Sequence, residues 1–263
     1  MFRFLLLNVL FTFIFLNFVH ASEKPNYAKI AHAGGAFKAG IGFKKETYTN
    51  SLDALNVNKH YTNLFEIDFR FTSDNHLVCI HDWDNGARNN FFLKFVPKRP
   101  SLKTFEDYVD KNIKYKNCTI YTLIDWLIEN PDTYIITDIK EKNLEGLKFI
   151  ASNYPYLVHR FIPQIYEPEK EYELVKAMGY QNIIWTLYKN ASYVTEEILR
   201  KNIPNMNLYA ITIPVMYAER NMASTIKEID KNLFVYTHTI NDNEKFMTLR
   251  KTGVDGIYTD YLY

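Results

Sequence analysis

TYIITDIKEKNLEGLKFIASNYPYLVHRFIPQI, residues 133–165, decides the fold of this chain. Two short apolar runs, 133–139 and 160–165, flank a helical pattern over 143–153. Runs of this length that are rich in Ile, Val and Tyr are typical of buried strands. A helix between two such strands predicts a parallel strand–helix–strand unit, and hence an α/β protein.

The same alternation continues on both sides of this stretch. The further predicted strands are 28–32, 64–71, 182–187, 208–213, 233–238 and 256–260, and the further helical patterns are 168–180, 195–202 and 241–253. Eight parallel strands are the number that closes a (β/α)8 TIM barrel. An open doubly wound sheet is the alternative, but residues 32–42 are rich in glycine without the Gly-x-Gly-x-x-Gly spacing of its phosphate loop. We therefore predict the barrel.

An antiparallel hairpin is expected after the second strand. In FEIDFRFTSDNHLVCIHD, residues 65–82, a turn sequence separates the strand from a second, shorter apolar run. If Thr72 faces Leu77 across that turn, the register places Asp68 directly opposite His81.

The N-terminus has the layout of a secretory signal peptide. A long apolar run ends in a small-residue site, so we predict a signal peptide over 1–21 and a single mature domain over 22–263. The alternative is an uncleaved membrane anchor, which Asn8, Asn17 and His20 disfavour. These features predict a secreted or periplasmic protein with no stable membrane span after signal removal.

The composition bears on nucleic-acid binding and on cysteine chemistry. The chain has 31 Lys and Arg against 30 Asp and Glu, so it offers no electrostatic reason to bind nucleic acid. Its two cysteines allow one disulfide but lack the spacing of a zinc site, and a buried free thiol is the favoured interpretation for Cys79. We expect a monomer.

Titratable side chains gather where the predicted strands end. Because alternate side chains of a strand share a face, Glu66 and Asp68 point to the barrel axis while their apolar neighbours point to the helices. Barrel enzymes keep their active sites at the carboxyl ends of the strands. We therefore expect one rim to bring together His32, Glu66, Asp68, His81, Asp138 and Lys140.

This set of residue types predicts a particular chemistry. Three carboxylates without a thiolate suit a hard divalent metal, Ca2+ or Mg2+. Two histidines suit general acid and base roles, and a lysine suits a phosphate oxygen. The combination predicts metal-assisted phosphodiester cleavage. Three further residues are candidates for substrate binding, with ordinary packing as the alternative for each: Gln164, Trp185 and His238.

The order of these residues resembles the glycerophosphodiester phosphodiesterase family, within the phosphatidylinositol-phospholipase-C-like superfamily. The family pattern is His-Arg-Gly, Pro-Glu-Asn-Thr, Glu-x-Asp, Thr-x-Asp-Gly, His-Asp, Glu-Ile-Lys, Trp-Thr-Val-Asn and Gly-Ile-Ile-Thr-Asp. The counterparts here begin at His32, Tyr48, Glu66, Thr72, His81, Asp138, His238 and Gly256. The resemblance implies acid–base roles for the two early histidines, a metal held by the three carboxylates, and phosphate contact by Lys140. It also implies attack by a neighbouring glycerol hydroxyl, followed by opening of a cyclic phosphate by water.

Several positions depart from the family pattern. Ala33 stands where the family has a phosphate-gripping arginine, and Thr49 stands where it has a glutamate. Asp138 is shorter than the family's glutamate, although its Asp-x-Lys spacing also resembles the sphingomyelinase D branch of the superfamily. The missing positive charge has three possible replacements in the following loop: Lys38, Lys44 and Lys45.

The leading functional hypothesis is a metal-dependent phosphodiester hydrolase. Its substrates would be glycerophosphodiesters, or related phosphodiesters of phospholipid headgroups or a surface polymer. A phospholipase D-like lyase that forms a cyclic phosphate is one alternative, and a catalytically inactive phosphodiester-binding barrel is another. We also expect residues 84–100, a long stretch without periodicity, to serve function.

Overall fold

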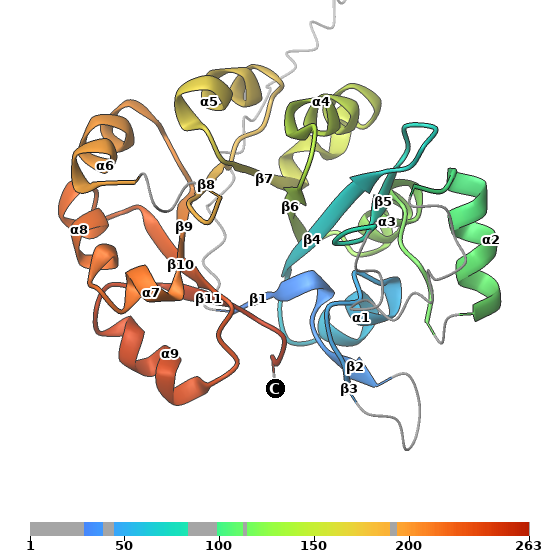
Figure 1. The fold of residues 1–263 in the computed structure, drawn as a ribbon, viewed down its shortest axis with the longest axis horizontal. Helices are drawn as coiled ribbons and strands as arrows, with labels where there is room; N and C mark the ends of the chain where they lie inside the picture. The colour runs from blue at the N-terminus through green and yellow to red at the C-terminus, as the bar shows by residue number, and fades with distance from the viewer. Residues whose placement is uncertain (1–28, 39–44, 84–98, 113–114, 190–193, 263) are drawn as a thin grey trace, which may run out of the picture.

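Eight parallel strands close into a barrel in the computed structural model, which describes residues 29–38, 45–83, 99–112, 115–189 and 194–262 (Figure 1). The strands follow the order β1-β11-β10-β9-β8-β7-β6-β4, and β1 pairs with β4 to close the ring. Their bounds are β1 (Lys29–Ala31), β4 (Leu64–Phe71), β6 (Tyr134–Ile139), β7 (Phe161–Ile165), β8 (Ile184–Thr186), β9 (Ala210–Pro214), β10 (Phe234–His238) and β11 (Gly256–Thr259). The predicted TIM barrel is confirmed.

Helices surround the barrel on the outside (Figure 1). The α-helices are α1 (Leu52–Asn58), α2 (Leu102–Asn112), α3 (Ile120–Glu129), α4 (Asn143–Asn153), α5 (Pro168–Ala177), α6 (Glu196–Asn202), α7 (Val215–Ala218), α8 (Met222–Ile229) and α9 (Asn243–Arg250). The 3-10 helices are η1 (His32–Gly34), η4 (Pro155–Arg160) and η6 (Ile203–Asn205). The predicted signal peptide and residues 84–98 lie outside the described residues.

Local sequence signals explain where the helices begin. The side chains of Ser51, Thr195 and Asp242 accept hydrogen bonds from backbone N–H groups in the first turns of α1, α6 and α9. Pro168 occupies the start of α5, where its missing N–H costs nothing. All four helical patterns predicted between strands are present.

The core has two layers, as strand alternation requires. Inside the barrel, one cluster of buried, mainly apolar side chains consists of Ile30, Leu64, Ile136, Ile162, Ile184, Tyr209, Ala210, Tyr236 and Tyr258. Outward-facing residues such as Phe65, Ile67 and Phe69 pack in a larger cluster against the helices. The apolar inner layer leaves the carboxyl ends of the strands as the polar end of the barrel.

The predicted hairpin is present, but its predicted register was wrong by one residue. Strand β5 (Leu77–Cys79) pairs antiparallel with β4, with Phe71 opposite Leu77 and Phe69 opposite Cys79. The turn is tighter than predicted because Thr72 N–H donates to the carbonyl of His76 at 2.8 Å, and the Thr72 hydroxyl accepts from His76 N–H. Ile80 rather than His81 therefore lies opposite Asp68. A separate two-stranded ribbon joins β2 (Phe37–Lys38) and β3 (Lys45–Glu46).

Cys79 forms a disulfide with Cys118, so the interpretation of Cys79 as a free thiol was wrong. The hairpin brings β5 alongside the segment that leads into α3, where Cys79 N–H donates to the Cys118 carbonyl at 2.9 Å. The two Cα atoms are 5.1 Å apart across a sequence separation of 39 residues. The bond fixes the strand that precedes His81.

Removing this disulfide should lower stability substantially. Closing a loop of this length in the unfolded chain is worth about 4 kcal/mol, so Cys79→Ala with Cys118→Ala should lower the free energy of unfolding by about that amount. Urea denaturation measures the change. Dithiothreitol should destabilise the wild type and leave the double variant unaffected; equal stability of the two proteins would contradict a formed disulfide.

Candidate functional site

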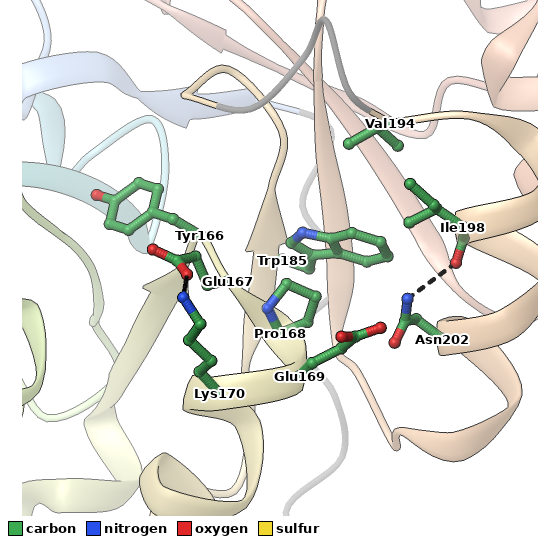
Figure 2. Close-up of a pocket in the computed structure, with 9 residues that line it drawn as sticks. All are labelled: Tyr166, Glu167, Pro168, Glu169, Lys170, Trp185, Val194, Ile198 and Asn202. Atoms are coloured by element: carbon green, nitrogen blue, oxygen red, sulfur yellow. Dashed lines mark hydrogen bonds and ion pairs between the residues drawn. The ribbon is translucent and has the colours of Figure 1, made fainter.

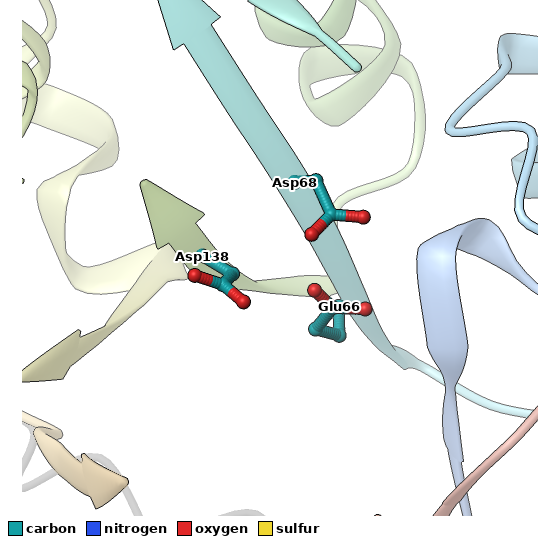
Figure 3. A group of neighbouring side chains, drawn as sticks. All are labelled: Glu66, Asp68 and Asp138. Atoms are coloured by element: carbon teal, nitrogen blue, oxygen red, sulfur yellow. The ribbon is translucent and has the colours of Figure 1, made fainter. Parts of the chain in front are cut away.

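Three buried carboxylates meet at the polar end of the barrel (Figure 3). Glu66 and Asp68 lie on β4, and Asp138 lies on the neighbouring strand β6 in register with Asp68. The residues are only 3%, 1% and 4% exposed. Each presents one oxygen to the others, and these oxygens all lie within 4.8 Å of one another. Buried like charges at this distance require compensation.

Lys140 and two tyrosines stabilise the buried negative charge of Asp138. The Lys140 ammonium donates to Asp138 and lies 3.1 Å from Asp68. The hydroxyls of Tyr166 and Tyr188 also donate to Asp138. Burial alone would raise the pKa of Asp138, but Lys140 and these hydrogen bonds lower it. Asp138 is therefore a stable carboxylate.

Asp68 has a second partner besides Lys140, whereas Glu66 has fewer hydrogen-bond donors. Asn50 donates to Asp68 at 3.0 Å and accepts from the Asp68 N–H at 2.9 Å. The backbone N–H of Ala33 donates to Glu66 at 2.8 Å. Burial, followed by the charge of Asp68, raises the pKa of Glu66 to about 8. The protein groups around Glu66 therefore leave its negative charge incompletely compensated.

The carboxylate set fits a divalent cation. Oxygens on opposite sides of Ca2+ are about 4.6–5.2 Å apart, so one ion can span three oxygens that lie within 4.8 Å. All three donors are hard carboxylate oxygens, the type that Ca2+ and Mg2+ prefer. A cation would also relieve the repulsion that raises the pKa of Glu66. Glu66, Asp68 and Asp138 are the residues that would hold it.

His32 is oriented by a carboxylate from the last strand. Its Nδ1 lies 2.9 Å from Oδ1 of Asp260, and because a carboxylate only accepts, Nδ1 donates. Asn241 supports Asp260 through a hydrogen bond of 2.7 Å. Burial lowers the pKa of His32, but the bond to Asp260 and the charge of Glu66 outweigh it, so the net shift is upward. This bond uses Nδ1, so Nε2 is the ring nitrogen that can exchange a proton with a bound molecule.

His81 is held in the same way by its neighbour. Its Nδ1 donates to Asp82 at 2.7 Å, and the Arg70 guanidinium donates to the His81 backbone carbonyl at 2.9 Å. His81 reaches the site despite the shifted register because β5 ends at Cys79 and the chain then bends. In both histidines, Nδ1 is thus hydrogen-bonded to a carboxylate.

These groups line one cavity of about 280 Å³. The lining residues are His32, Tyr48, Glu66, Asp68, His81, Asp138, Lys140, Gln164, Tyr188, His238, Thr239 and Tyr258. The structure therefore brings together eight of the nine predicted site residues. Among them, His238 has its pKa lowered to about 4, by burial first and then by the charge of His32. Its imidazole is neutral at physiological pH.

Trp185 is the predicted site residue that the structure places elsewhere (Figure 2). On β8, Ile184 belongs to the inner layer of the barrel and Trp185 to the outer cluster, because neighbouring side chains of a strand point to opposite faces. Trp185 lines a second cavity of about 450 Å³ between α5 and α6, beside Pro168. Its assignment to the substrate pocket was wrong.

The lysines suggested as replacements for the missing arginine do not line the central cavity. Lys38 is exposed, and Lys45 lies over the ring of Tyr261 with its ammonium 5.2 Å from the ring centre. Lys44 lies outside the described residues. Lys140 is the lysine among the described lining residues.

Among the residues of the site that were not assigned a role from the sequence are Tyr48, Asn50, Tyr166, Tyr188 and Asp260. Asn50 and Asp260 fall within the quoted family motifs, so their position was a usable signal. Tyr48 also begins a motif counterpart, whereas Tyr166 and Tyr188 carry no such signal, because the chain has 20 tyrosines and most resemble core residues.

Comparison with known proteins supports the fold independently. The sequence matches no family model and no curated protein. A glycerophosphodiester phosphodiesterase structure from Thermotoga maritima is 18% identical, covers 89% of this chain and 95% of its own, and has a TM-score of 0.65. One from Parabacteroides distasonis is 15% identical, with coverages of 90% and 94% and a TM-score of 0.65. The chain has the fold of the glycerophosphodiester phosphodiesterases.

A third structure with this fold has a bound product. It is a phosphodiesterase from Oleispira antarctica in complex with sn-glycerol-3-phosphate, 15% identical to this chain. It covers 89% of this chain and 93% of its own, with a TM-score of 0.60. At these identities the likeness concerns the fold alone.

Binding of Ca2+ or Mg2+ should stabilise the chain through Glu66. A cation at 100 times its Kd should raise the Tm by about 5–10 °C. Glu66→Gln should abolish that rise while leaving the metal-free Tm unchanged or higher, because burial already favours the uncharged form of Glu66 when no metal is bound. Thermal unfolding with each cation and with EDTA measures both effects. The exposed Glu173→Gln is the control; a full metal-induced rise in Glu66→Gln would exclude Glu66 from the site.

Asp260 should set the protonation of His32. Asp260→Asn removes the negative charge and weakens the bond to Nδ1 while the burial stays, so the pKa of His32 should fall below its wild-type value. NMR titration of the histidine ring protons reads this directly. The exposed Asp132→Asn should leave the titration unchanged. An unaltered His32 titration in Asp260→Asn would contradict the pairing.

Proposed function

We propose that this protein is a metal-dependent phosphodiester hydrolase that acts on glycerophosphodiesters or related phosphodiesters of phospholipid headgroups or surface polymers. One observation carries the proposal. Two histidines, each held at Nδ1 by a carboxylate, line the same cavity as a cluster of three carboxylates. Such a pair suits proton transfer on both sides of a phosphoryl group.

The two histidines divide the proton transfers. One removes the proton from the attacking hydroxyl as its oxygen bonds to phosphorus, and the other protonates the leaving alcohol oxygen as its bond to phosphorus breaks. The raised pKa of His32 favours its protonated form near neutral pH, which supports the acid role for His32 and the base role for His81. With a glycerol hydroxyl as nucleophile the product is a cyclic phosphate, which water opens with the roles exchanged.

Lys140 and the carboxylates serve the phosphoryl group. The Lys140 ammonium lies between Asp68 and Asp138 and lines the cavity, within reach of a phosphate oxygen bound there. Glu66, Asp68 and Asp138 would hold the cation, whose contribution is to neutralise charge on the phosphoryl oxygens. Gln164 and His238 line the same cavity and would contact the substrate's alcohol groups.

The size of the cavity favours a compact substrate. Small-molecule sites usually measure about 300–1,000 Å³, so about 280 Å³ suits a headgroup phosphodiester rather than a whole diacyl lipid. This supports glycerophosphodiesters, or the exposed units of a surface polymer, over intact phospholipids.

Export is part of the proposal. The predicted signal peptide and the Cys79–Cys118 disulfide are separate features that agree, because disulfides persist in oxidising compartments. No helix within the described part of the chain combines the length and apolarity needed to cross a bilayer. We propose a secreted or periplasmic enzyme that acts as a monomer.

Product analysis tests the reaction directly. The mature chain, residues 22–263, is incubated with a panel of glycerophosphodiesters and Ca2+, Mg2+ or EDTA, and phosphorus NMR resolves the products. Metal-dependent release of a phosphomonoester is expected. His81→Ala should lower kcat by about 10²–10⁴-fold, the usual contribution of a general acid or base. Its metal affinity by calorimetry should stay close to that of the wild type.

A control variant and the products formed distinguish the proposed hydrolase from the two alternatives. The exposed His159→Ala should retain wild-type turnover. A cyclic phosphate that persists would identify the phospholipase D-like lyase instead of the hydrolase. Headgroup binding without turnover under any metal would identify an inactive phosphodiester-binding barrel.

A further inference from the structure

Tyr48 lies between the two histidines of the site. Its ring centre is 4.5 Å from that of His32, with the planes at 82°, and 5.0 Å from that of His81, with the planes at 70°. Both are edge-to-face contacts, the arrangement that aromatic pairs favour. Tyr48 also lines the cavity. One side chain therefore touches both candidate proton-transfer groups.

The backbone holds Tyr48 there at a cost. Its φ is +62°, in the left-handed region that a bulky residue rarely adopts, and Asn50 has φ +49°. The segment is fixed on two sides, because Asn50 N–H donates to the Ala33 carbonyl at 3.0 Å and the Asn50 side chain pairs with Asp68. Strain maintained by surrounding contacts in this way is characteristic of functional sites.

We propose that Tyr48 is a positioning residue that sets the spacing and ring orientation of His32 and His81, an inference that rests on the proposed function. Each histidine has a hydrogen bond at Nδ1, to Asp260 or Asp82, and a single bond of this kind leaves the ring able to tilt about it. The contact with Tyr48 restrains that tilt on both rings at once. The two Nε2 atoms then keep a fixed relation to a substrate placed between them.

Two substitutions distinguish the effect of the Tyr48 ring from that of its hydroxyl. Tyr48→Phe keeps both ring contacts, so kcat should stay within about threefold of wild type. Tyr48→Gly removes the ring, and misplacement by about 1 Å can cost 10²-fold, so kcat should fall by about 100-fold with KM within about threefold. Glycine accepts positive φ without strain, so the Tm of Tyr48→Gly should stay within about 4 °C of wild type.

The kcat values of these variants test the positioning role of Tyr48. Wild-type kcat in Tyr48→Gly would overturn the inference, and so would an equal loss in Tyr48→Phe, because the hydroxyl rather than the ring would then be the active part. If Tyr48→Gly does not fold, Tyr48→Asn replaces it, since asparagine also tolerates the left-handed region. The same loss of kcat at retained Tm is expected there.

An NMR readout keeps this inference separate from the proposed function. The ring protons of His32 and His81 should keep their chemical shifts in Tyr48→Phe and move together in Tyr48→Gly, while those of the exposed His159 stay fixed. A wild-type chain that cleaves no phosphodiester would overturn the proposed function alone. Unchanged His32 and His81 signals in Tyr48→Gly would overturn the role of Tyr48 whatever the activity.

Discussion

Buried negative charge is the constraint on which this site depends. Glu66, Asp68 and Asp138 lie almost fully buried on adjacent strands, and an uncompensated charge in such a place would be strongly destabilising. The surrounding elements respond to it: Lys140 lies between two of the carboxylates, and Asn50 pairs with one of them. The negative charge that these contacts leave is compatible with a divalent cation at this cluster.

The two histidines are oriented by a second set of carboxylates. Asp260, which follows the last strand, orients His32 from the far end of the sequence, and Asp82 orients its direct neighbour His81. Neither histidine depends on the acidic cluster for its orientation. Tyr48 is the contact between the two, and it lies in the segment that also supports the cluster. The carboxylate cluster and the two histidines are therefore held by different contacts within one cavity.

The departures from the family pattern have structural counterparts. Ala33 is fully buried and serves Glu66 through its backbone N–H, so its side chain takes no part in the cavity. Thr49 is also buried, and its hydroxyl pairs with that of Ser51, which begins α1. Ala33 and Thr49 therefore contribute to the structure around the site. Lys140 is the lysine among the described residues that line the cavity.

The sequence by itself determined the barrel and the acidic cluster, because both follow from short-range periodicity. Alternation along β4 turns Glu66 and Asp68 inward, and the repeated strand–helix units close eight strands. The outward placement of Trp185 also follows from alternation, once the position of β8 is fixed. Tertiary structure alone decided the hairpin register and the disulfide of Cys79. It also decided the position of Tyr48 between the histidines. These features depend on turn geometry and on contacts between residues far apart in the chain, which no local pattern encodes.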